Sequence, residues 1–135
     1  MPALAPRRPK RRTEATVLAE TRLALCSMPG VTVWRNTTGF AETDGRKFRY
    51  GLCPGSSDLV GCLRVTPPGS SVPLAVALFV ETKHPTSGRL AADQATFGEV
   101  VRRLGAVHIV ASSADDAVLQ LHLHRKRIEN GGTFT

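Results

Sequence analysis

One stretch of the chain is far more apolar than the rest. It covers residues 73–80 and leads directly into Glu81-Thr82-Lys83. A continuous apolar run bounded by turn residues is typical of a strand that is covered on both faces. Weaker patterns predict further strands at 31–36, 58–65 and 106–111. Pro67-Pro68-Gly69 separates the 58–65 strand from the apolar run, which predicts an antiparallel hairpin connection.

Three other segments repeat apolar residues at helical spacing. The first follows Thr13, a capping residue, and ends before Pro29-Gly30. The second covers 91–104, and the third opens with a capping-box sequence at 113–116. The side chains expected to face the core are Val17, Thr21, Ala24 and Met28 in the first helix, Phe97, Val100, Val101 and Leu104 in the second, and Ala117, Val118 and Leu121 in the third.

These elements follow the order α-β-β-β-α-β-α, which predicts an α/β fold with a mixed central sheet flanked by helices. A long polar loop, with room for a short hairpin arm, connects the first two strands. The length of 135 residues is typical of one domain. We expect a flexible basic arm at 1–12, one folded domain at 13–128 and a C-terminal tail at 129–135.

Positive charge exceeds negative charge along the chain. Eighteen Lys and Arg against eleven Asp and Glu give a net charge of +7, and residues 1–12 contain five cations and no acid. This excess suggests a polyanionic partner. No apolar run is long enough to span a membrane, and no secretory signal is evident. The three cysteines lack CxxC spacing, which favours reduced thiols and a cytoplasmic protein.

Three ionisable residues are expected to meet at one edge of the sheet, namely Asp58, Glu81 and Lys83. Antiparallel pairing brings the strand ends together, and alternation points Glu81 and Lys83 to one side and Thr82 to the other. An ion pair is one interpretation, because unpaired buried charge is costly. A magnesium site is the other, because Mg²⁺ takes one or two protein carboxylates together with water and phosphate oxygens. The metal would act as Lewis acid and template, and Lys83 would hold or deprotonate water or offset phosphate charge.

Three motifs in order carry a family resemblance: Gly55-Ser-Ser-Asp-Leu-Val-Gly61, Phe79-Val-Glu-Thr-Lys83 and Gln94-Ala-Thr-Phe97. With them the chain resembles the virus-type replication-repair nuclease (VRR-NUC) family, a branch of the PD-(D/E)XK phosphodiesterase superfamily with a restriction-endonuclease-like core. The resemblance spans about residues 17–118. An ExK motif alone is weak, but the three motifs at these spacings form a strong combined signal. One departure is Ser57, which stands where the superfamily's name has Pro.

The resemblance implies a role for each matching position of the sheet. Asp58 and Glu81 would be metal ligands, and the Thr82 carbonyl would be a further ligand. Lys83 would be the catalytic lysine.

Two helix residues also receive roles from the resemblance. Gln94 would face the site from the second helix, and Glu20 would approach the metal from the first helix through water or a second ion. Considered without the resemblance, both are ordinary polar residues on amphipathic helices, which usually face solvent.

Polar residues after the first strand and in the long loop are expected to contact DNA phosphates: Arg35, Asn36, Arg46, Lys47 and Arg49. The chain has only five Phe, one Trp and one Tyr. The sequence shows no aromatic stripe of the kind on which single-stranded DNA stacks. We therefore expect duplex or branched DNA as the partner.

Together these patterns favour a metal-dependent DNA endonuclease that hydrolyses phosphodiester bonds with Mg²⁺ or Mn²⁺. The resemblance implies a homodimer acting on branched DNA such as four-way (Holliday) junctions, and a bacterial or phage origin. A two-fold symmetric junction needs two sites related by a dyad. The alternatives are a restriction-like or flap-processing nuclease on duplex or single-strand ends, and a non-catalytic DNA-binding module. Two carboxylates would repel DNA phosphates, which disfavours the module.

Overall fold

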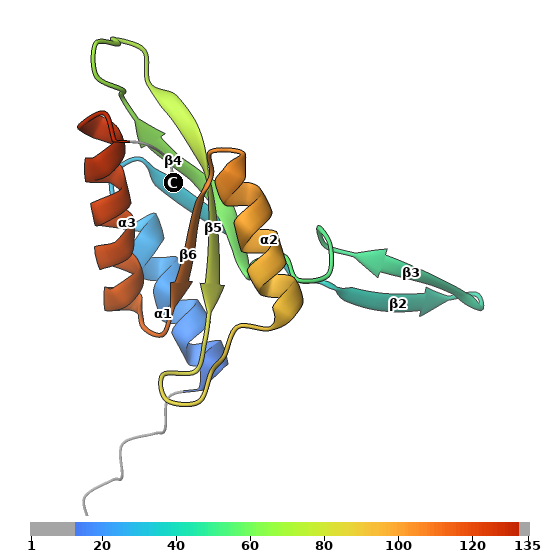
Figure 1. Ribbon diagram of the computed structural model, residues 1–135. Helices are drawn as coiled ribbons and strands as arrows, with labels where there is room; N and C mark the ends of the chain where they lie inside the picture. Colours follow the sequence, from blue (N-terminus) through green and yellow to red (C-terminus); the bar gives the residue numbers. More distant parts are fainter. Residues whose placement is uncertain (1–12, 133–135) are drawn as a thin grey trace, which may run out of the picture.

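Four strands form one mixed sheet at the centre of the molecule, in the order β1-β4-β5-β6 (Figure 1). The computed structural model describes residues 13–132. The elements along the chain are α1 (Glu14–Cys26), β1 (Val31–Arg35), β2 (Gly39–Thr43), β3 (Arg46–Tyr50), β4 (Leu59–Val65), β5 (Leu74–Thr82), α2 (Ala92–Arg103), β6 (Val107–Ala111) and α3 (Ala114–Glu129). Antiparallel pairs join β1 to β4 and β4 to β5, and β6 is parallel to β5. The predicted α/β class, the mixed sheet and the hairpin connection are therefore confirmed. The expected basic arm at 1–12 and residues 133–135 of the expected tail lie outside the described residues.

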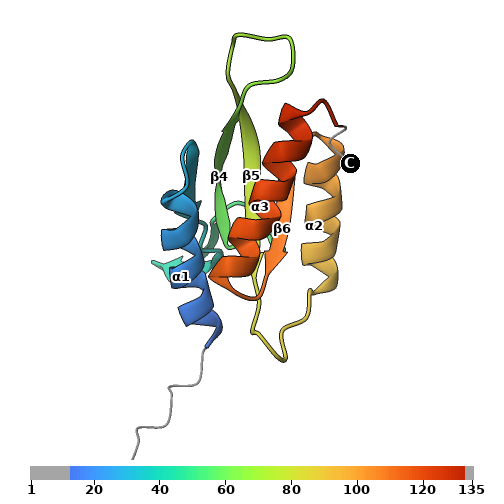
Figure 2. The ribbon, with the colours of Figure 1, turned by 90° about the vertical axis from the view of Figure 1, so that its left-hand side faces the viewer.

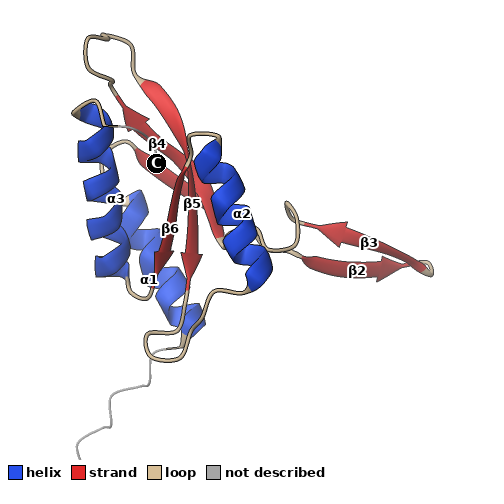
Figure 3. Cartoon of the chain, viewed as in Figure 1, coloured by secondary structure: helices blue, strands red, loops and turns tan. Residues whose placement is uncertain are grey.

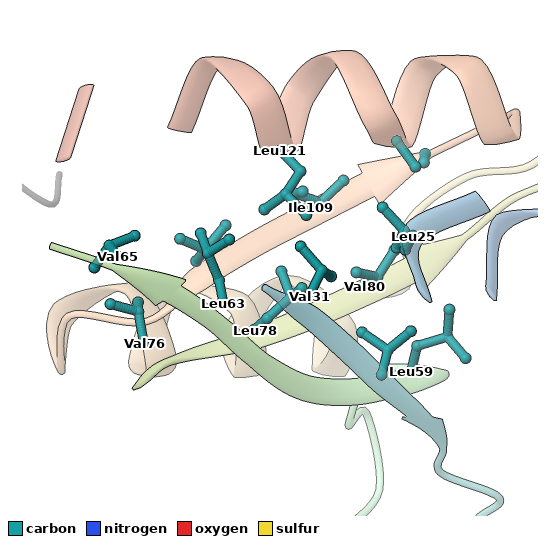
Figure 4. Packing of buried hydrophobic residues seen from close by; sticks show 14 of the residues in the cluster. Leu25, Val31, Leu59, Leu63, Val65, Val76, Leu78, Val80, Ile109 and Leu121 are labelled. Atoms are coloured by element: carbon teal, nitrogen blue, oxygen red, sulfur yellow. The ribbon is translucent and has the colours of Figure 1, made fainter. Parts of the chain in front are cut away.

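Alternate residues of the sheet point to one face and form the core with α1 and α3 (Figures 2 and 4). Leu59, Leu78 and Ile109 on this face are fully buried. Burial of each such side chain stabilises the fold by about 1.5–3 kcal/mol. Helix α2 covers the opposite face, where Phe97 packs edge-on against Phe79 with ring centroids 5.2 Å apart. The second half of β5, from Leu78 onward, is thus covered on both sides, as its apolar run predicts, whereas Leu74, Ala75 and Ala77 in the first half are exposed.

Side-chain caps fix the starts of two helices, as predicted. The Thr13 Oγ1 of α1 accepts a hydrogen bond from the Thr16 N–H at 3.1 Å. The Ser113 Oγ of α3 accepts one from the Asp116 N–H at 3.0 Å. Both bonds satisfy backbone donors that have no partner inside the helix. None of the helices in this described range combines the length and the apolar character needed to cross a membrane.

The buried face of α1 was predicted in part. Val17 and Thr21 are buried as expected, but Leu18 and Leu25 complete the buried stripe and Ala24 is only half-buried. Leucine buries more apolar surface than alanine, so the helix turns Leu18 and Leu25 toward the core, whereas Leu23 is exposed.

The predicted burial of α2 is wrong at two positions. Val101 is buried and Phe97 half-buried, but Val100 is 51% exposed and Leu104 is 83% exposed. Helix α2 contacts chiefly β6 and has no second helix beside it comparable to the α1–α3 pair. Only a narrow stripe of its surface is therefore covered.

His108 of β6 is a buried core histidine. Its ring lies against Gly98 of α2, where an added Cβ would lie 2.6 Å from the imidazole Cε1. A hydrogen bond of 3.1 Å joins its Nδ1 to the Nη1 of Arg102. Burial, and secondarily the charge of Arg102, lower the pKa of His108 to about 4, so the ring is neutral at pH 7.

The long loop between β1 and β4 forms a two-stranded hairpin, β2–β3, that projects from the sheet (Figures 1 and 3). Strand alternation places Phe48 and Tyr50 on the same face of this hairpin, and both rings are exposed. The shared face of these two rings was not predicted, because the polar composition of the segment favours a loop, in which residues do not alternate between two faces.

Gly61 ends the Gly55–Gly61 motif and lies within β4 where this strand pairs with β1. It allows the two strands to approach closely. A Cβ at this position would lie 1.8 Å from the carbonyl oxygen of Thr32. Any side chain would therefore push β1 away from β4.

Gly61→Ala is expected to lower the free energy of unfolding by about 1–3 kcal/mol, because the methyl group overpacks the β1–β4 contact. Urea denaturation of the purified protein measures this change. Cys62→Ala is the control, since the neighbouring Cys62 is exposed and should change stability by no more than about 0.5 kcal/mol. Equal stability of Gly61→Ala and the wild type would contradict the close approach.

Candidate active site

Asp58, Glu81 and Lys83 lie at one edge of the sheet, where β4 begins and β5 ends. Leu59 pairs with Val80, and one further step of the same register places Asp58 opposite Glu81. Directly paired residues share a face of the sheet, so the two carboxyl groups converge. The Lys83 Nζ lies 3.6 Å from the Glu81 Oε1. The structure thus brings the three predicted residues together.

The carboxyl group of Asp58 is held by the end of β5. Its Oδ2 accepts hydrogen bonds from the Thr82 N–H at 2.9 Å and from the Thr82 Oγ1 at 3.1 Å. Both bonds go to the same oxygen, which fixes the orientation of the carboxylate. The second oxygen, Oδ1, lies outside this pair of bonds.

Gln94 bridges the other two residues from the first turn of α2. Its Nε2 donates to the Glu81 Oε1 at 2.7 Å, and its Oε1 accepts from the Lys83 Nζ at 2.8 Å. The same Oε1 accepts from the Ala91 N–H at 2.9 Å, as the third residue of a helix does in a capping box. The start of the helix therefore fixes the amide that holds both side chains. The predicted orientation of Gln94 toward the site agrees with these bonds.

Glu81 is almost completely removed from water. It is 2% exposed, and its Oε2 is buried without a hydrogen-bond partner among the described residues. Burial is the largest cause that raises its pKa to about 8, and the charge and hydrogen bond of Asp58 add to it. Lys83 acts in the opposite direction but does not offset these effects. In the absence of a cation the carboxyl group holds its proton at neutral pH.

Asn36, which follows β1, ties down the loop before Asp58. Its Nδ2 donates to the Ser56 Oγ at 2.8 Å and to the Ser57 carbonyl at 2.9 Å, and its Oδ1 accepts from the Leu52 N–H at 3.2 Å. Its own N–H donates to the Asp58 carbonyl at 2.8 Å. Sequence reasoning missed this positioning role, for which the polar turn before Asp58 is the available signal. A DNA contact by Asn36 stays a prediction.

The other predicted site residues lie on α1, at the ends of β1 and β5, and on β3. Glu20 is half-buried on α1, and Thr82 is fully buried at the end of β5. Their roles as metal ligands stay predictions. The cations expected to contact DNA are exposed, with Arg35 at the end of β1 and three on the projecting strand β3: Arg46, Lys47 and Arg49.

The two carboxyl groups fit a hard divalent cation. Across residues 13–132, no set of three or more His, Cys, Asp or Glu side chains is grouped to bind a metal ion. Mg²⁺ and Mn²⁺ commonly need fewer protein ligands, because water and phosphate oxygens complete the coordination. Asp58 and Glu81 supply two carboxylates, and the unpartnered Glu81 Oε2 is an acceptor that such a cation would satisfy.

Comparison with known proteins adds no relative. Neither the protein-family models nor the curated proteins match the chain. The functional argument therefore depends on the geometry of the site and on the motif resemblance.

Glu81→Gln is expected to stabilise the cation-free protein at about pH 9 and to change its stability little at about pH 5. The folded-state pKa of about 8 lies above the ordinary 4.5, so the folded protein retains a proton that the unfolded chain loses. Wild-type stability therefore falls as pH rises from 4.5 to 8, whereas a neutral glutamine causes no such fall.

Urea unfolding in chelator at several pH values measures this difference. Glu99→Gln is the control, because Glu99 is exposed on α2 and forms a surface pair with Arg103. Stability curves of wild type and Glu81→Gln that stay parallel across this pH range would contradict the raised pKa.

Proposed function

We propose that the protein is a Mg²⁺- or Mn²⁺-dependent endonuclease that hydrolyses phosphodiester bonds in DNA. One observation carries the proposal: two converging carboxyl groups beside a lysine, one of them with a buried oxygen that has no partner. The motif resemblance and the element order, which agrees with a restriction-endonuclease-like core once β2 and β3 are set aside, support the same function.

A purely structural ion pair accounts poorly for this arrangement. The closest contact of the Lys83 Nζ is with Gln94 at 2.8 Å, whereas its separation from Glu81 is 3.6 Å. One lysine also faces two carboxyl groups, and the buried Glu81 Oε2 is left unsatisfied. A site built only for stability would pair or replace these groups, because a buried polar atom without a hydrogen-bond partner is costly.

Each side chain of the site would have its own role in hydrolysis. Asp58 and Glu81 would bind the cation, which supplies Lewis-acid polarisation of the phosphoryl group when bound. Lys83 presents an ammonium group that orients the attacking water and offsets negative charge on the phosphate in the transition state. Water attacks phosphorus and loses a proton to bulk water, the bond to the leaving oxygen breaks, and that oxygen takes up a proton from bulk water. Gln94 is a positioning residue that holds Lys83 and Glu81 in register.

The substrate and the assembly belong to the proposal as well. The family resemblance favours branched DNA such as four-way junctions and a homodimer that cuts paired strands. The exposed cations of the hairpin, Arg46 and Lys47 among them, support a polyanionic substrate.

Cleavage of labelled DNA tests this function directly. The purified protein is incubated with a four-way junction, a flap and a linear duplex, in Mg²⁺, in Mn²⁺ and in chelator. We expect metal-dependent cutting of the junction. Cutting of linear duplex or flaps would favour the restriction-like or flap-processing nuclease, and metal-independent binding without cutting would favour the DNA-binding module.

Lys83→Ala is expected to reduce the cleavage rate about 100- to 1,000-fold or more while DNA affinity stays close to that of the wild type. The lysine acts on the reacting phosphate and not on the DNA backbone at large. Single-turnover cleavage and binding in chelator measure the two quantities separately. Lys126→Ala removes the same charge from an exposed position of α3 and serves as the control. Undiminished cleavage by Lys83→Ala would remove this lysine from the mechanism.

A further inference from the structure

The β2–β3 hairpin exposes aromatic rings that no other element covers. Its two strands contact chiefly each other, and the hairpin projects away from the central sheet (Figure 1). Phe40, Phe48 and Tyr50 are 65%, 49% and 43% exposed. Isolated two-stranded hairpins are only marginally stable in water, so exposed rings on such an element indicate an interaction surface.

The strand register sorts these rings onto two faces. Tyr50 lies opposite Gly39 and Phe48 opposite Ala41, and Arg46 continues the same face opposite Thr43. The partners across the hairpin are thus small, which leaves the two rings and the arginine accessible. We call Arg46, Phe48 and Tyr50 the stacking face.

The opposite face of the hairpin has a different character. There Phe40 lies opposite Arg49, whose guanidinium is 4.5 Å from the centre of the Phe40 ring. Glu42 lies opposite Lys47, so an acidic side chain is paired with a basic one across the hairpin. The Phe40 ring is therefore already engaged by a cation, and this face carries two cations and one acid.

The stacking face has the spacing and chemistry of a nucleic-acid platform. Side chains two residues apart on a strand are separated by about 7 Å, so each ring can contact a separate base. Every base has an aromatic face, and stacking needs no hydrogen bond to the base edge. Arg46 supplies a positive charge for a phosphate next to the stacked bases.

The topology brings this surface to the candidate active site. The chain leaves the sheet after β1 and returns at Asp58, so the hairpin is inserted at the edge that carries Glu81. DNA bound to the hairpin would therefore lie at the same edge of the sheet as the carboxyl groups.

We propose that the hairpin binds unpaired bases of DNA by stacking them on Phe48 and Tyr50, with Arg46 at the adjoining phosphate. The proposal rests on the proposed function for the identity of the partner as DNA. It narrows the substrate to DNA in which bases are exposed, such as the branch point of a junction, in preference to continuous duplex, whose bases are covered by their neighbours.

Binding measured in chelator tests the proposal without requiring cleavage. Fluorescence anisotropy gives the Kd of the full-length protein for labelled oligothymidylate, a four-way junction and a continuous duplex. Phe48→Leu and Tyr50→Leu remove the rings but keep apolar side chains in the hairpin. Phe40→Leu is the matched control on the opposite face, and Phe48→Tyr and Tyr50→Phe retain an aromatic ring.

We expect each leucine variant of the stacking face to bind oligothymidylate about 5- to 100-fold more weakly and duplex almost unchanged. The aromatic replacements should retain wild-type affinity. Unchanged affinity for oligothymidylate, or an equal loss on duplex, would overturn the proposal. So would a change of oligomeric state in sedimentation that accounts for the whole loss, because the face would then bind a second copy of the chain.

The two proposals can fail separately. Loss of oligothymidylate binding in the leucine variants, together with a wild type that cuts no DNA in Mg²⁺ or Mn²⁺, would retain the stacking face and reject the nuclease. Metal-dependent cutting by a wild type whose leucine variants bind all three DNAs normally would retain the nuclease and reject the stacking face.

Discussion

The site depends on one constraint, which is that Asp58 and Glu81 disfavour ionisation of both carboxyl groups at the same pH. The β4–β5 register places the two groups on one face, burial of Glu81 raises its pKa most, and Lys83 supplies only one positive charge. The neighbouring groups hold the two carboxyl groups in place. Thr82 fixes Asp58 through two hydrogen bonds, and Gln94 fixes both Glu81 and Lys83.

Each of these fixed points belongs to the end of a regular element whose interior is buried. Leu59 and Val80 are the next residues inward along their strands from Asp58 and Glu81, and both are fully buried. Gln94 is held by the start of α2 through the Ala91 N–H. The stability of the core therefore maintains an arrangement that is unfavourable in itself. Sites that retain such local conflicts are commonly those on which function has placed a demand.

Local sequence signals account for most of what could be predicted. The turn after β4 and the apolar run of β5 determine which strand ends meet, so the juxtaposition of Asp58 with Glu81 followed from the sequence. The exposure of Leu104 did not, because it depends on which elements lie beside α2. The shared face of Phe48 and Tyr50 requires strand pairing that a polar loop composition conceals. The partners of Asn36 are equally hidden, since they lie 16 to 21 residues away along the chain.

The hydrogen bonds of Asn36 have a consequence for how this molecule can diversify. A single amide joins Leu52, where the chain leaves the hairpin, to Ser56 and Ser57 before the first carboxylate. The segment inserted between β1 and β4 is thus held at both of its ends by the side chain of Asn36. The hairpin between these ends can be replaced by a longer or shorter segment while the carboxyl groups keep their places. The hairpin, and with it what the hairpin contacts, can then change while the side chains around Asp58 keep their arrangement.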